Sequence, residues 1–137
     1  MSSSSLNSLN EAALDSDPLQ RYRLVQPLAE EIGRLCQQEI DRLGFDNQTV
    51  QLKQPGEAEF SLEKDPSNGV FTLVGKWLDQ RGFKLGMLVF YNDGSFYIEQ
   101  DVVRPHPARK RWFVEAINAW GNAEDIKVEA KLVPMPE

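Results

Sequence analysis

The residues of this chain whose types and spacing suit binding chemistry lie in the segment Arg104-Pro-His-Pro-Ala-Arg-Lys-Arg111. The segment holds four of the fifteen Lys and Arg residues and the single histidine of a chain whose formal net charge is -6. Guanidinium and ammonium groups bind phosphates and carboxylates, and imidazole can transfer protons near neutral pH. We therefore predict a site for an anion or an acidic partner, formed by Arg104, His106, Arg109, Lys110 and Arg111.

A structural interpretation of the same segment stays open. The charges can be solvated at a corner between a strand and a helix, balanced by Glu99 and Asp101 nearby. His106 lies between two prolines, and the sequence identifies no partner for it in acid–base catalysis, which depends on geometry first. No catalytic residue is predicted, and the sequence favours a protein that is not an enzyme.

Composition limits the remaining classes of function. The chain has 137 residues, of which 41% are hydrophobic and 26% are charged, as in ordinary soluble domains. We expect a Ser/Asn-rich disordered tail over residues 1–16 and a single domain over residues 17–137. The acidic net charge argues against a nucleic-acid-coating protein, because such binding neutralises phosphates with positive charge. The one cysteine, Cys36, excludes an intrachain disulfide, and we predict a buried thiol, a cytoplasmic location and no metal or cofactor.

An amphipathic helix is predicted near the N-terminus. Asp17 and Pro18 suit a helix start, and Gly44 suits its end. Apolar residues recur between them at intervals of three and four. Pro27 interrupts this pattern, so the helix either kinks or is divided there.

The middle of the chain reads as antiparallel strands, over roughly 57–64, 70–78, 84–91 and 95–103, with a possible short strand near 49–53. Asp93-Gly94 predicts a two-residue type I′ turn, which would pair Tyr91 with Phe96. A second helix is expected from Pro107 to Trp120, with Phe113 and Trp120 on its buried stripe. The last strand, roughly 126–133, alternates apolar with charged residues.

The central strands are apolar on both faces, which a one-sided sheet is not. Phe90 would pair with Tyr97, and Leu88 would lie beside them, on a face that two helices on the other side of the sheet do not cover. Trp112 would lie beside the basic segment and away from the helix stripe. We therefore predict an interface that includes Trp112, Phe90, Tyr97 and Leu88, and a homodimer that uses it.

Together these patterns predict an α+β protein of two layers. A long N-terminal helix and a second helix before the last strand would pack on an antiparallel meander of four to five strands. The protein is expected to be a small cytoplasmic protein-binding or adaptor domain that uses exposed sheet and the basic corner. A chaperone-like role is one form that this function can take. Two alternatives remain: a ligand-binding domain or enzyme with an anion pocket near Arg104 and His106, and a specific nucleic-acid binder. No membrane association is expected.

Overall fold

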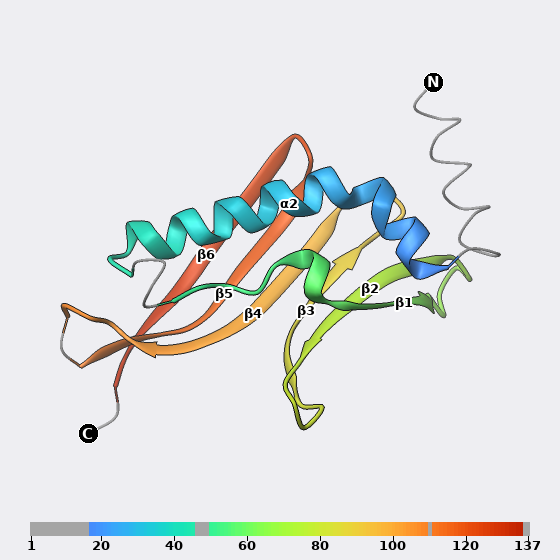
Figure 1. Ribbon diagram of the computed structural model, residues 1–137. Coiled ribbons are helices and arrows are strands. Elements are labelled where there is room, and N and C mark those ends of the chain that lie inside the picture. Colours follow the sequence, from blue (N-terminus) through green and yellow to red (C-terminus); the bar gives the residue numbers. More distant parts are fainter. Residues whose placement is uncertain (1–16, 46–49, 110, 136–137) are drawn as a thin grey trace.

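The computed structural model of the chain describes residues 17–45, 50–109 and 111–135. The helix α2 (Pro18–Arg42) is followed by a short 3₁₀ helix, η1 (Pro55–Glu57), and by six strands. The strands are β1 (Glu59–Lys64), β2 (Phe71–Leu78), β3 (Lys84–Phe90), β4 (Phe96–Pro105), β5 (Trp112–Asn122) and β6 (Asp125–Pro134). They form one antiparallel meander in the order β1-β2-β3-β4-β5-β6, and α2 lies across one face of this sheet (Figure 1). The α+β class is confirmed, whereas the tail expected over residues 1–16 lies outside the described residues.

The long helix begins and ends where the sequence predicts. The side chain of Asp17 accepts a hydrogen bond from the backbone N–H of Leu19 at 2.9 Å, which caps the first turn. Pro27 lies inside one continuous helix and does not divide it. The helix ends at Arg42, and Gly44 follows with a φ of +102°, the left-handed conformation in which helices often terminate.

The apolar stripe of α2 packs against the sheet to form the core. Ala29, Ile32 and Ile40 have no exposed surface, and Cys36 retains 5%. They face buried residues of β2 to β5, among them Leu73, Leu88, Ile98, Ile117 and Val114. The predicted burial of Cys36 is confirmed, and burial raises the pKa of its thiol to about 12.

The second helix predicted from Pro107 to Trp120 is wrong. Residues 112–122 form strand β5, which pairs with β4 on one side and β6 on the other. Val114, Ile117 and Ala119 are buried against the core, but a bulge at Glu115 interrupts their alternation. The sheet therefore has six strands, more than the four to five predicted. The additional strand expected near 49–53 is absent from the described residues 50–53, which run irregularly.

The turn between β3 and β4 has three residues and not the predicted two. Tyr91 donates its N–H to the carbonyl of Ser95, and Gly94 adopts a φ of +92° at the last loop position. Phe90 is therefore the partner of Phe96, and Leu88 the partner of Ile98. This one-residue change of register places these four side chains under α2 and moves Val89 to the opposite face.

The opposite face of the sheet is not covered by any element among the described residues, because α2 and η1 are their only helices. We call this surface the open face. The described residues contain no helix that is both long and apolar enough to span a bilayer.

Candidate functional sites

The basic segment predicted to start a helix is instead the connection between β4 and β5. The N–H of His106 donates to the carbonyl of Trp112 at 2.8 Å, which closes the connection as a hairpin loop. Because no helix starts here, these charges lie on a loop between two strands. Lys110 lies outside the described residues.

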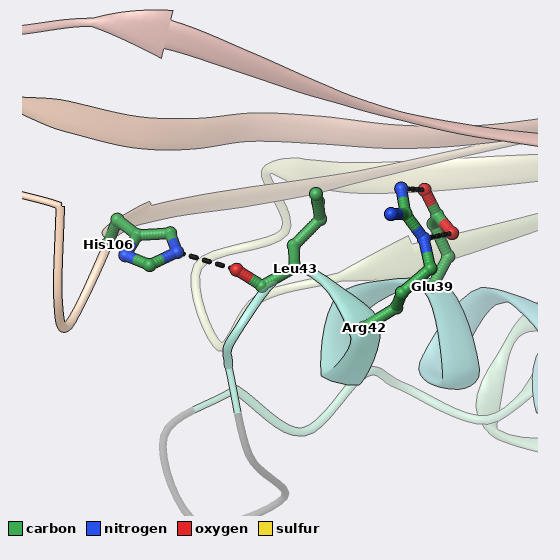
Figure 2. A network of polar contacts seen from close by, with 4 residues as sticks. All are labelled: Glu39, Arg42, Leu43 and His106. Atoms are coloured by element: carbon green, nitrogen blue, oxygen red, sulfur yellow. Dashed lines mark hydrogen bonds and ion pairs between the residues drawn. The ribbon is translucent and has the colours of Figure 1, made fainter.

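His106 is buried, with 9% of its surface exposed, and its ring is held from two sides. Nδ1 accepts hydrogen bonds from the backbone N–H groups of Ala108 and Arg109, at 3.0 and 2.8 Å. Nε2 lies 2.6 Å from the carbonyl oxygen of Leu43 at the end of α2 (Figure 2). The ring also packs edge-on against Phe45. Both nitrogens are therefore used in holding the fold, and neither is available to bind an anion.

The arginines of the segment also make contacts within the chain. Arg104 donates from Nη1 to the carbonyl oxygens of Val102 and Val103, at 3.3 and 3.2 Å. The guanidinium of Arg109 lies over the ring of Trp112, 5.0 Å from its centre. Arg111 has a φ of +72° and accepts, through its carbonyl, the N–H of Met135. The segment thus ties β4, β5 and the end of β6 together, and four predicted site residues do not converge on one described pocket.

A cleft of about 390 Å³ lies beside this segment, between residues 50–53 and the second half of β4. Arg104, Lys53 and Asp101 line it, whereas His106 does not. Val103 also lines it with a φ of +45°, which is strained for a β-branched residue. At its base the Gln100 side chain accepts from the Lys53 N–H at 2.8 Å and donates to its carbonyl.

The predicted interface residues separate in the structure. Leu88 and Phe90 are 0% and 4% exposed beneath α2, so their prediction as interface residues is wrong. Tyr97 lies on the open face and is half-buried. Trp112 is half-buried at the start of β5, where it carries Arg109.

One row of residues crosses the open face in register. Cross-strand pairing aligns Val74 of β2, Val89 of β3, Tyr97 of β4 and Trp120 of β5. Ser61 and Lys127 extend the row to the two edge strands. An apolar centre with a polar rim is the usual anatomy of a protein interface, and Tyr and Trp are enriched there.

The two ends of this row differ in relief. Trp120 is 38% exposed, whereas Val74 and Val89 are each 6% exposed although they lie outside the core cluster. A hollow of about 410 Å³ lies over these valines and Met87. Trp120 was expected in the core because a helical period was assigned to residues 107–120. In a strand, Trp120 shares a face with the polar Asn118 two residues earlier, and this is the signal that identifies its face.

The charged side chains around the hollow have a formal excess of one positive charge. Its rim carries Lys64, Lys76 and Lys84 against two carboxylates. Glu63 lies 3.8 Å from the ammonium of Lys76. Asp65 accepts hydrogen bonds from the N–H and hydroxyl of Ser67, which hold the pKa of its carboxyl below the ordinary value.

A hydrogen-bonded chain orients the aromatic centre of the open face. The Tyr97 hydroxyl donates to Glu99 and accepts from the Asn118 amide, both at 2.9 Å. Burial, together with the Glu99 carboxylate, raises the pKa of Tyr97 above its ordinary value. The ring is therefore held in one orientation by neighbours on β4 and β5.

The described residues contain no cluster of His, Cys, Asp and Glu able to hold a metal ion. Comparison of the chain with protein-family models, with curated proteins and with solved structures finds no match.

Proposed function

We propose that this protein is a cytoplasmic, non-enzymatic binding domain that docks a protein partner on its open face. The observation that carries the proposal is the aligned row from Val74 to Trp120, with a hollow at one end and a projecting indole at the other. Large hydrophobic side chains on a pre-formed sheet act as binding anchors, because little conformational entropy is lost when they are covered.

The residues that line the hollow indicate the chemistry of the partner. Val74, Val89 and Met87 offer an apolar floor, and three lysines lie on the rim. An apolar side chain flanked by carboxylates would fill this hollow and place its charges next to the lysines. The partner is accordingly a protein segment with an exposed apolar residue between acidic residues.

The test is photo-crosslinking in cells with benzoylphenylalanine at position 120 of the open face. The same group at position 24 is the matched control, because Leu24 is 58% exposed on α2. We expect a discrete adduct from position 120, lost when Lys76→Glu and Lys84→Glu reverse the rim charges, and no such adduct from position 24. Adducts of equal yield from both positions, or none from position 120, would refute the proposal. An adduct of twice the chain mass would identify a second copy as the partner.

The cleft beside β4 supports a second candidate, an anion-binding site. Its specific support is a strained residue, Val103, next to the two cations Arg104 and Lys53. Titration with inorganic phosphate, followed by the backbone amide resonances of residues 50–53, tests it. Shifts that disappear in Lys53→Ala would support the site, and unchanged resonances would remove it.

A further inference from the structure

We infer that two copies of this chain pair through the outer edges of their β6 strands, antiparallel and centred on Val128. Among the described residues β6 has one neighbouring strand, β5, so its other edge is open. It spans ten residues, whereas the other edge strand, β1, spans six. A long edge with free backbone groups is a template for another strand. This inference is independent of the proposed function, because it uses the edge of the sheet and leaves the open face accessible.

The hairpin that leads into β6 fixes which backbone groups point outward. A two-residue loop joins Asn122 to Asp125, so these two residues form the hydrogen-bonded closing pair. Hydrogen-bonded and non-hydrogen-bonded pairs alternate from there. The N–H and C=O groups of Lys127 and Glu129 consequently point toward β5. Those of Ile126, Val128 and Ala130 point away from it and are available to a second copy.

The charges of β6 select one register. On its open-face side the strand carries Asp125, Lys127, Glu129 and Lys131. A pairing centred on Val128 places Lys127 opposite Glu129 of the second copy, and Asp125 opposite Lys131 of the second copy. The two-fold axis repeats both pairs, so all four charges of each strand face opposite charges. Opposite charges in directly facing positions stabilise antiparallel strands.

Neighbouring registers do not have this complementarity. A pairing centred on Glu129 would oppose Lys127 to Lys131 of the second copy, and one centred on Lys127 would oppose two copies of that lysine. Within the chain, Lys127 contacts Asp125 at 2.6 Å and Lys131 contacts Glu115 at 3.1 Å. These ion pairs are exposed, and exposed pairs contribute little, so they present a small barrier to re-pairing.

The side of β6 that faces α2 carries apolar residues next to the open edge. A groove of about 650 Å³ runs between α2 and β6, and Leu35, Ile126 and Val128 form its apolar part. Ile126 and Val128 are only half-buried in the single chain. A strand added from the second copy would place its own Ile126 and Val128 beside this groove. These side chains would extend the apolar layer beneath the outer side of α2.

Charge reversal tests the pairing. An acidic-edge variant carries Lys127→Glu and Lys131→Glu, and a basic-edge variant carries Asp125→Lys and Glu129→Lys. Sedimentation velocity of the full chain at micromolar concentration should show a dimer, weakened about tenfold or more in each variant alone. An equimolar mixture of the variants should restore it as a heterodimer, because an acidic edge then faces a basic one.

The matched control is Glu59→Lys with Glu63→Lys. It makes the same charge change as the basic-edge variant, on the same side of the sheet but on β1, and should leave the dimer intact. A monomeric parent chain would overturn the inference, and so would a dimer that neither edge variant weakens. Circular dichroism of each variant verifies that a lost dimer is not an unfolded chain.

Disulfide trapping tests the register. Lys127 and Glu129 of the second copy would form a non-hydrogen-bonded pair with Cα atoms about 4.5 Å apart, which a disulfide can bridge. A mixture of Lys127→Cys and Glu129→Cys chains should give a covalent dimer on mild oxidation, in greater yield than either chain alone. Cys36 is buried and does not compete. Equal yields from the mixture and from each chain alone would refute the register.

Discussion

The imidazole Nε2 of His106 lies 2.6 Å from the carbonyl oxygen of Leu43, the residue that caps the C-terminal end of α2. Backbone N–H groups can only donate, so Nδ1, which receives those of Ala108 and Arg109, carries no proton. Nε2 therefore carries the proton, and its N–H donates a hydrogen bond to the carbonyl oxygen of Leu43. One ring thus joins the end of the helix to the β4–β5 connection.

His106→Phe should destabilise the fold although it retains a ring of similar size. The substitution leaves the Leu43 carbonyl and two backbone N–H groups without their partner, at an expected cost of about 1–3 kcal/mol in the free energy of unfolding. Urea denaturation measures this cost. Nitrogen-15 NMR of the parent protein should show Nε2 protonated and Nδ1 unprotonated. The opposite tautomer, or a variant as stable as the parent, would contradict the assigned role.

Gly44→Ala should cost more than a positive φ alone requires. Gly44 has a φ of +102°, and a Cβ there would lie 3.1 Å from Nε2 of His106. Gly82→Ala is the matched control, because Gly82 has a φ of +88° with open space around its Cβ. Both should lose about 1 kcal/mol from backbone strain, and Gly44→Ala should lose more.

The excess at Gly44 should disappear when His106 is replaced by alanine, because the contact is then absent. Chemical denaturation of the single and double variants gives this coupling directly. Equal losses at Gly44 and Gly82 would show that the imidazole yields without cost.

The helix α2 was predictable because its signals are local. Asp17 and Gly44 mark its ends, and the intervals between apolar residues mark its buried face. The strand β5 was not, because Phe113, Ala116, Ile117 and Trp120 happen to fit a helical period. The bulge at Glu115 hides the strand alternation, and bulges depend on the neighbouring strands. Pairing with β4 and β6 therefore overrode the local pattern.

The candidate site was predicted only in part, for the same reason. Tyr97 was assigned to an exposed face and lies on one, but Leu88 and Phe90 were assigned to it with a turn one residue too short. A two-residue and a three-residue loop at Asn92-Asp93-Gly94 are both compatible with the local sequence. The choice reverses which strand residues face the helix. His106 was predicted as a ligand-binding residue, and its contact with Leu43, which lies 63 residues earlier in the chain, has no signal in the local sequence.

The β3–β4 turn should contribute stability that depends on pH. The Asp93 carboxylate accepts hydrogen bonds from the hydroxyl and from the N–H of Ser95. These bonds, the one from the hydroxyl foremost, hold the pKa of Asp93 below its ordinary value. A carboxyl with a lowered pKa in the folded state stabilises the fold above its unfolded-state pKa of about 4, and this contribution is lost as pH falls through the folded value.

Asp93→Asn retains an acceptor oxygen and removes the charge, so it isolates this effect. The parent should be more stable than the variant at about pH 7, and the difference should shrink at acid pH, as the parent carboxyl becomes protonated on passing its lowered folded-state pKa. Urea denaturation at both pH values provides the measurement. A difference that grows on acidification would reverse the assigned sign.

Replacing the buried Arg21 with an uncharged side chain of similar length should not destabilise the fold. Arg21 is 4% exposed, its Nη2 donates to the Asn92 side-chain oxygen, and its Nη1 has no hydrogen-bond partner in the described part of the chain. Burial accordingly lowers the pKa of this guanidinium. Arg21→Met keeps a long apolar side chain and removes an incompletely paired charge, so its stability should equal or exceed that of the parent.

Asn92→Ala should be destabilising by about 1–3 kcal/mol, because it removes the acceptor for Arg21 and the donor to the Phe71 carbonyl. Part of that loss arises because the Arg21 guanidinium is left buried without its acceptor. This part should be recovered in the double variant Arg21→Met with Asn92→Ala. Chemical denaturation of the four proteins completes the cycle. If the two single changes add with no coupling, the guanidinium does not depend on Asn92, and the contact does not tie the start of α2 to the β3–β4 turn energetically.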